Sequence, residues 1–232
     1  MLDVFFDKWW RVGGVAGILF LIMFIVGITL QGEPPTFDEP VDEIRDWFAD
    51  NGEQYLVGDY LTGLAFLLFF LPFLASLRGL LAVAEGGPAV WSRVAFAGGL
   101  LFLIFGGVAS FFWATLAYSF GTVGNGDDGT LKTLKTLMYL DQVGFSTGAL
   151  AVIPLMLGAS LVTLRTGVLW RWLSLLGLIV AVFAGIAGAS SLTSDPDGAL
   201  GGIGFIGFIG FGLWMLLVSV NMILKKEAPT AA

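Results

Sequence analysis

The chain alternates between long apolar runs and short polar stretches. Apolar runs cover residues 12–31, 56–78, 94–119, 134–164, 170–191 and 201–224. Each run reaches the ~20 residues that an α-helix needs to cross a bilayer, and none has the two-residue alternation of a membrane barrel strand. The pattern predicts an all-α membrane protein with six transmembrane helices, forming one polytopic domain over residues 1–232.

One polar connection has a periodicity of its own. In residues 38–51, Val41, Ile44, Trp47 and Phe48 recur at helical spacing among acidic residues. Asn51 and Gly52 tolerate left-handed backbone geometry, which is typical of a helix end. We therefore expect a short amphipathic helix, ending at this pair, on the outer surface of the membrane.

The first two pairs of apolar runs are similar to each other. The stretch that begins at Arg11 aligns without gaps on the stretch that begins at Arg93, a shift of 82 residues, and the same shift places Asp59 on Asp141 and Pro72 on Pro154. Trp170-Arg171 indicates a weaker third copy. We interpret the chain as three hairpin repeats related by rotation about the membrane normal. The alternative is chance similarity between stretches of low complexity.

Composition excludes a soluble protein and several kinds of chemistry. Hydrophobic residues make up 57% of the chain and charged residues 12%, and there is neither histidine nor cysteine. Sites that need these side chains, such as thiolate zinc, His-ligated haem, iron–sulfur clusters and Ser–His pairs, are thereby excluded. We expect no enzyme, no cofactor, no metal site and no nucleic-acid partner.

Basic residues predict the orientation in the membrane, because Lys and Arg are retained in the cytoplasm. Eight of them fall on one side of a six-span arrangement: Lys8, Arg11, Arg78, Arg93, Arg165, Arg171, Lys225 and Lys226. Three fall on the other side: Arg45, Lys132 and Lys135. We therefore expect a multi-pass protein of the cell inner (plasma) membrane with both termini cytoplasmic.

Asp59 and Asp141 are the acidic residues closest to the apolar runs. An ionised carboxylate inside the bilayer costs at least ~2.5–3.5 kcal/mol, so such groups usually face a cavity or a partner. One hypothesis is that the repeat brings both acids to an outward-facing vestibule that binds a cation or a solute. Its other lining residues would be Tyr60, Thr62, Tyr118, Tyr139, Gln142, Ser146 and Thr147. The alternative is that both acids lie hydrated at the membrane surface.

Prolines and glycines mark the expected packing of the helices. Pro72 and Pro154 lie within apolar runs, where each removes a backbone hydrogen bond, and they serve either as hinges or as fixed kinks. Small residues allow helices to approach closely, either within the chain or between copies of it. The positions are Gly13, Gly17, Gly185, Ala189, Gly204, Gly207 and Gly210.

Acidic residues gather in the first outer connection, where residues 33–53 have a net charge of −7, equal to the formal net charge of the whole chain. This field either concentrates cations at an outer entrance or belongs to a solvated face. In the second case Trp47 and Phe48 would enter the lipid headgroups.

Several boundary motifs carry a family resemblance. They are the stretch Gly52 to Tyr60, the run Leu77-Arg78-Gly79-Leu80-Leu81 followed by Ala84-Glu85-Gly86-Gly87, and the stretch Leu164 to Trp172. With the arginine-led first span, they resemble small six-span bacterial membrane proteins described as domains of unknown function. The resemblance covers nearly the whole chain and implies the fold and a bacterial inner membrane, but no activity.

Two functions from different classes remain open. The first is a small transport or solute-binding bundle, in which Asp59 and Asp141 form the site. The second is a structural or accessory subunit, whose glycine faces contact a second copy or a larger membrane complex. Both have the lipid bilayer as their principal partner.

Overall fold

The computed structural model describes residues 8–35, 39–122, 128–192 and 199–227. Within these ranges the side chains at 41, 109, 121–122, 128, 130–143, 145, 191–192 and 199–201 are not described. All regular structure in the described part is helical. Six helical stretches are long and apolar enough to cross a membrane: Trp9–Gln31, Asp42–Glu85, Val90–Phe120, Ser146–Thr166, Arg171–Gly188 and Gly202–Leu224. The prediction of an all-α, multi-pass membrane protein is confirmed.

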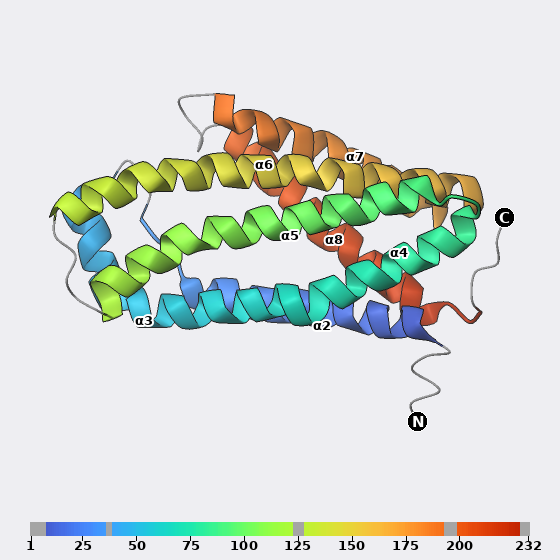
Figure 1. The fold of residues 1–232 in the computed structure, drawn as a ribbon, viewed down its shortest axis with the longest axis horizontal. Coiled ribbons are helices and arrows are strands. Elements are labelled where there is room, and N and C mark those ends of the chain that lie inside the picture. The colour runs from blue at the N-terminus through green and yellow to red at the C-terminus, as the bar shows by residue number, and fades with distance from the viewer. Residues whose placement is uncertain (1–7, 36–38, 123–127, 193–198, 228–232) are drawn as a thin grey trace.

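The helices form an elongated closed bundle (Figure 1). In chain order they are α2 (Trp9–Gln31), α3 (Val41–Ala65), η1 (Phe66–Phe70), α4 (Leu71–Glu85), α5 (Val90–Leu116), η2 (Ala117–Thr122), α6 (Asp128–Thr166), α7 (Arg171–Gly188), η3 (Ala189–Leu192) and α8 (Ala199–Leu224). The segment α3–η1–α4 packs against α2 and α5, and α6 packs against α5 and α7. Because α8 packs against both α7 and α2, the ring is closed.

Hydrogen bonds close this ring at one end of the bundle. Trp10 Nε1 and the Arg11 guanidinium donate to the main-chain oxygen of Lys225, the Arg11 Nη2 at 3.0 Å. Lys225 Nζ donates to the main-chain oxygen of Val168 at 3.0 Å. The start of α2, the end of α8 and the α6–α7 connection therefore lie together (Figure 1). We call this the basic end, because Arg11, Arg165 and Lys225 lie there.

The segment predicted as a separate surface helix is the first part of a transmembrane helix. Residues 42–85 form one uninterrupted helical stretch, so the expected helix end at Asn51 and Gly52 is wrong. Asn51 Nδ2 donates to the main-chain oxygen of Trp47, one turn earlier, and this bond lies within the helix. The first turns of α3 cross the end of the bundle opposite the basic end (Figure 1).

The apolar face of these first turns packs against protein. Ile44 and Phe48 are fully buried, in a cluster with Tyr55, Leu116 and Phe120. Burial of these side chains outweighs the ~1 kcal/mol that a glycine costs inside a helix. The amphipathic pattern was therefore interpreted correctly, but the expected insertion of Phe48 into lipid headgroups is wrong.

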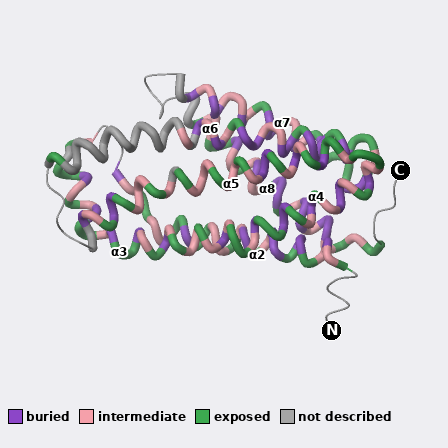
Figure 2. The backbone as a smooth tube through the Cα atoms, in the orientation of Figure 1, coloured by how far each residue is buried: buried purple, intermediate pink, exposed green. Residues whose placement is uncertain are grey.

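Aromatic rings fill the middle of the bundle. Phe20 of α2 contacts Phe70 of η1, with ring centroids 5.2 Å apart, and Phe70 contacts Phe102 of α5 at 5.9 Å. Phe102 in turn contacts Phe211 of α8 at 5.3 Å. Figure 2 shows exposed positions along the outside of the helices, and many of these are large apolar residues, such as Ile25 and Val182. This outer surface is suited to contact with lipid.

Glycines allow the helices to approach closely, as predicted. A Cβ atom at Gly17 would collide with Ser219 of α8 and Phe73 of α4, and one at Gly207 would lie 2.7 Å from Phe183 of α7. Gly204 faces Ala187 of α7 in the same way. These glycine positions therefore allow close packing between helices of the same chain.

The two prolines lie in different surroundings. Before Pro72, η1 is a π-helical turn, in which the Leu71 N–H donates to the Phe66 carbonyl five residues earlier. This wider turn accommodates the ring, and the helix changes direction where α4 begins (Figure 1). Pro154 lies inside the continuous helix α6.

Candidate functional site

Two pairs of aromatic rings join α3 and η1 to α5. Near one end, Tyr55 packs on Trp113 with ring centroids 6.4 Å apart. Further along, Phe66 packs on Phe102 at 5.9 Å. Eleven residues separate the two rings on each of the antiparallel segments, a rise of about 16 Å. The ring pairs therefore mark the two ends of a strip along which α3 faces α5.

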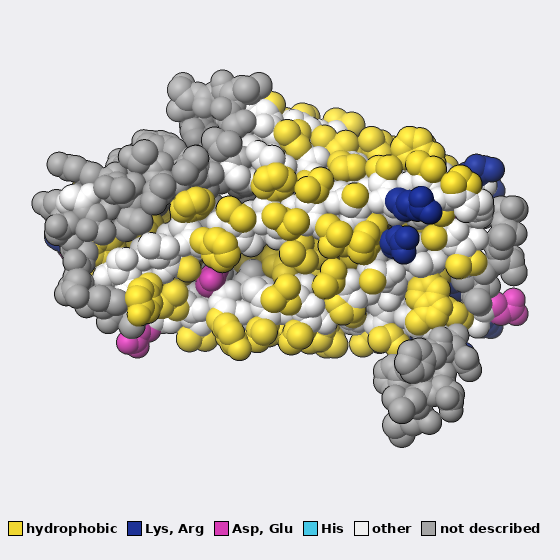
Figure 3. Space-filling view, viewed as in Figure 1, with side chains coloured by type: hydrophobic (Ala, Val, Ile, Leu, Met, Phe, Trp, Pro, Cys, Tyr) yellow, Lys and Arg dark blue, Asp and Glu magenta, His cyan; other side chains and the backbone are white. Residues whose placement is uncertain are grey.

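Small residues occupy this strip between the ring pairs. Gly63 lies between Tyr55 and Phe66 on the helical face of α3, and Gly106 lies between Phe102 and Trp113 on α5. A Cβ atom at either glycine would meet no heavy atom within 4 Å, so both face open space. Figure 3 shows the surface hollowed between α5 and α3, with an acidic side chain beside the hollow. We call this hollow the α3–α5 gap.

Asp59 belongs to the same face of α3, one turn after Tyr55 and one turn before Gly63. Its side chain is partly buried, and in the described part of the chain its carboxylate has neither a hydrogen-bond nor an ion-pair partner. Asp59 belongs to a helical stretch that is a candidate membrane span by length and composition, and its carboxylate is partly shielded from water by the protein. Such a group usually faces a ligand or a cavity.

The remaining residues of the predicted vestibule are dispersed or lie outside the described side chains. Tyr60 and Tyr118 are 65% and 56% exposed on the outer surface. Thr62 faces α2, where its Oγ1 accepts a 3.4 Å hydrogen bond from Gln31, and Ser146 is buried 3.2 Å from Ser190 of η3. Outside the described side chains lie Tyr139, Asp141 and Gln142. The convergence of Asp59 with Asp141 stays a prediction.

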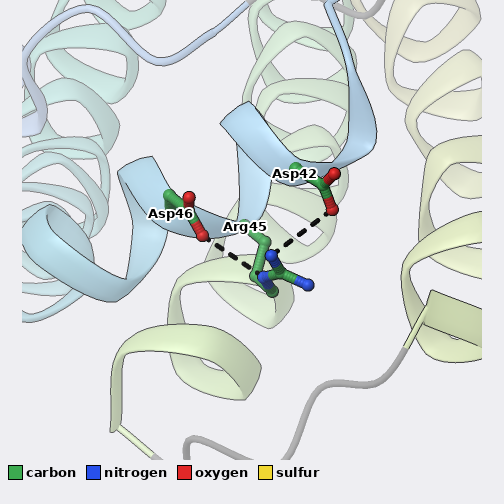
Figure 4. Close-up of polar contacts among 3 residues, drawn as sticks. All are labelled: Asp42, Arg45 and Asp46. Carbon is green, nitrogen blue, oxygen red and sulfur yellow. Dashed lines mark hydrogen bonds and ion pairs between the residues drawn. The ribbon is translucent and has the colours of Figure 1, made fainter.

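Charges of the first turns of α3 are partly neutralised by local ion pairs. Arg45 Nη2 lies 3.3 Å from Asp42 Oδ1, and its Nε donates to Asp46 Oδ1 at 3.3 Å (Figure 4). All three side chains are exposed enough for solvent to screen these pairs, which typically contribute less than ~1 kcal/mol. The described residues contain no group of three acidic side chains arranged to hold a metal ion.

At the basic end, Glu85 caps a neighbouring helix. Its Oε1 accepts from the Trp91 N–H and its Oε2 from the Ser92 N–H, both at 2.9 Å. These are among the donors that the first turn of α5 leaves without a helical partner. Arg165 of α6 lines a hollow of about 420 Å³ beside this cap. Glu85 is therefore a structural carboxylate and differs in this respect from Asp59.

Sequence reasoning identified Asp59 but missed the residues that form the gap around it. Tyr55, Trp113, Phe66 and Phe102 carry no chemical signature, and glycines are frequent throughout the chain. A usable signal was the equal spacing of the rings on two antiparallel segments, with a glycine between them. It becomes informative only once α3 and α5 are known to be neighbours.

No family model, no curated protein and no solved structure matches the chain. The resemblance to small six-span bacterial membrane proteins therefore stays a prediction. What the geometry supports for this chain is a multi-pass helical membrane protein with a partly buried carboxylate beside a hollow.

Proposed function

We propose that the protein binds an amphipathic organic cation in the α3–α5 gap, with Asp59 as its counter-charge. The unpartnered Asp59 carboxylate in a membrane-spanning helix is the observation that carries this proposal. A cation that places its charge beside Asp59 offsets the cost of keeping the carboxylate away from water.

The surroundings of Asp59 suit a ligand that is partly apolar. Tyr55 and Trp113 at one end of the gap and Phe66 and Phe102 at the other present ring faces and edges. Aromatic rings attract cations and also accept apolar groups, so both parts of an amphipathic cation find partners. Gly63 and Gly106 leave the space that the ligand fills.

A lateral site of this kind requires no passage along the bundle axis, where the rings of Phe20, Phe70, Phe102 and Phe211 are in contact. We therefore favour a binding protein, open toward the lipid, over an axial conduit. The alternative of an accessory subunit with glycine contact faces has less support. Gly17, Gly204 and Gly207 face other helices of the same chain.

We also propose that the basic end faces the cytoplasm of a bacterial inner membrane, since Lys and Arg are retained on that side. The repeat relation between the first two hairpins has support from packing. A Cβ atom at Gly13 would collide with Ser76, and one at Gly158 would lie 2.9 Å from the Cβ of Ala95. The shift of 82 residues relates these two contacts, because it places Gly13 on Ala95 and Ser76 on Gly158.

The test measures binding of tetraphenylphosphonium, a lipophilic cation, to the purified full chain in detergent by equilibrium dialysis. We expect Asp59→Asn to weaken binding by about ten-fold or more, because loss of one partner of a partly desolvated charge pair costs on the order of 2 kcal/mol or more. The matched control is Glu53→Gln, which removes the same charge from an exposed position of α3. It should bind as the unmodified protein does.

A second variant tests the gap itself. Gly106→Leu places a side chain in the open space and should reduce tetraphenylphosphonium binding although Asp59 is intact. Equal binding by Asp59→Asn and the unmodified chain, or an equal loss with Glu53→Gln, would show that the site is elsewhere or that only the net charge matters.

A further inference from the structure

A second hollow lies at the basic end, between the α6–α7 connection and the end of α8. It has a volume of about 220 Å³ and is lined by Gly167, Val168, Leu169, Trp170, Asn221, Leu224 and Lys225. Two of these lining residues, Asn221 and Lys225, carry polar side chains, and they lie one helical turn apart. The α3–α5 gap plays no part in this hollow.

Asn221 is a buried polar side chain that faces the hollow. The residue is 7% exposed, and within the described part of the chain its side-chain amide has no hydrogen-bond partner. Its main-chain oxygen accepts from the Lys225 N–H at 3.1 Å, as in a regular helix end. Because the amide opens onto the hollow, it is available to donate to or accept from a group bound there.

Lys225 lies beside this amide with little compensation for its charge. Its ammonium donates to the Val168 main-chain oxygen, and no carboxylate pairs with it in the part of the chain that the structure describes. Burial lowers the pKa of Lys225 from its ordinary value of 10.5. A bound anion would offset this desolvation.

The first turn of α7 provides further donors at the edge of the hollow. Trp170 is the residue that precedes this helix, and no side chain caps the N–H groups that follow it. The Leu173 N–H donates to the Trp170 oxygen at 2.9 Å. The N–H groups that precede it in this first turn are of the kind that ordinarily has no helical partner, and such groups favour anions. Exposed Arg171 adds a positive charge at the same place.

We propose that this hollow binds the phosphate group of an anionic phospholipid, with Asn221, Lys225 and the first turn of α7 as its ligands. The stacked rings of Trp170 and Trp172, 38% and 49% exposed, favour the lipid over a free anion. Exposed tryptophans of membrane proteins lie at the level of the headgroups, and the glycerol and acyl chains would then continue along the apolar exterior.

The experiment measures lipid retention by native mass spectrometry of the purified full chain, after exchange into detergent containing phosphatidylglycerol or phosphatidylcholine. We expect one phosphatidylglycerol to stay bound and phosphatidylcholine to be lost. Lys225→Gln should weaken phosphatidylglycerol retention about ten-fold, the effect of one charge-assisted hydrogen bond. Lys226→Gln, a matched control at an exposed position, should retain the lipid.

A second variant keeps the test informative if packing is disturbed. Asn221→Asp conserves volume and places a carboxylate beside Lys225, so lipid retention should fall while the thermal stability of the protein is maintained.

A further experiment adds inorganic phosphate alone. If phosphate binds in a Lys225-dependent manner and the lipid does not, the anion site stands and the lipid assignment is overturned. Equal losses in Lys225→Gln and Lys226→Gln would overturn the site as a whole.

Discussion

Gly158 of α6 shows how closely two helices meet in this bundle. A Cβ atom there would lie 2.5 Å from the main-chain oxygen of Trp91 and 2.8 Å from the Ala95 nitrogen. Both obstacles belong to the α5 backbone, which cannot move aside as a flexible side chain can. The α5–α6 contact therefore depends on the absence of a side chain at this position.

We accordingly expect Gly158→Ala to destabilise the protein by about 1–3 kcal/mol, the range for overpacking a well-packed interior. The matched control is Gly106→Ala on α5, where a methyl group meets no atom within 4 Å. That control should unfold at the same temperature as the unmodified chain or higher. Thermal unfolding in detergent, followed by circular dichroism, measures both, and equal stability of the two variants would contradict this description of the contact.

Asp59 shows which part of the candidate site can be predicted from single residues of the sequence. Its place at the start of an apolar run identified it as a candidate, because a carboxylate near hydrocarbon is rare. The α3–α5 gap could not be predicted, since it depends on which helices are neighbours and on the rings that hold them apart. Ser146 illustrates the opposite case: its position in the chain resembled a vestibule residue, yet it is buried beside Ser190.

At the scale of elements, helix ends show when local sequence preference determines the structure and when packing overrides it. Asn51 and Gly52 are typical of a helix end, but burial of Ile44, Phe48 and Tyr55 continues the helix through them. The turn after α4 contains Gly86 and Gly87, and Gly86 there has a φ of 69°, which favours glycine. Local preference prevails only where tertiary packing does not oppose it.

The start of α5 depends on the carboxylate that ends α4. Glu85 accepts from two N–H groups, so we expect Glu85→Gln, whose side-chain nitrogen cannot accept, to leave one donor unsatisfied. Loss of such a cap typically costs about 1 kcal/mol. Chemical unfolding in mixed micelles would measure this, with Glu227→Gln, exposed beyond the end of α8, as the control. An unchanged midpoint would mean that water replaces the carboxylate without loss.

At the scale of the whole molecule, the number of spans was predictable and their arrangement was not. Long apolar runs define crossings by length alone. The contact between α2 and α8 joins residues far apart in the sequence, through Trp10, Arg11 and Lys225, and no local pattern indicates it.

Six crossings of the membrane determine from which side an introduced cysteine can be labelled. The chain has no cysteine, so single cysteines can be introduced and labelled with a membrane-impermeant maleimide. Pro88→Cys and Glu227→Cys, both exposed near the basic end, should react identically, whereas Asp50→Cys on α3 should react only from the other side of the membrane. Different labelling of positions 88 and 227 in intact cells would contradict six crossings.

The contact between α2 and α8 also has a consequence for biosynthesis. Gly14 of α2 lies against the Ser219 main-chain oxygen and Ile223 of α8, which is the last of the described helices to leave the ribosome. Until then this face of the first helix has only lipid, or an insertion factor, to cover it. Completion of the native bundle is therefore a late event of translation, and a chain halted before α8 would expose a glycine-lined seam to the membrane quality-control machinery.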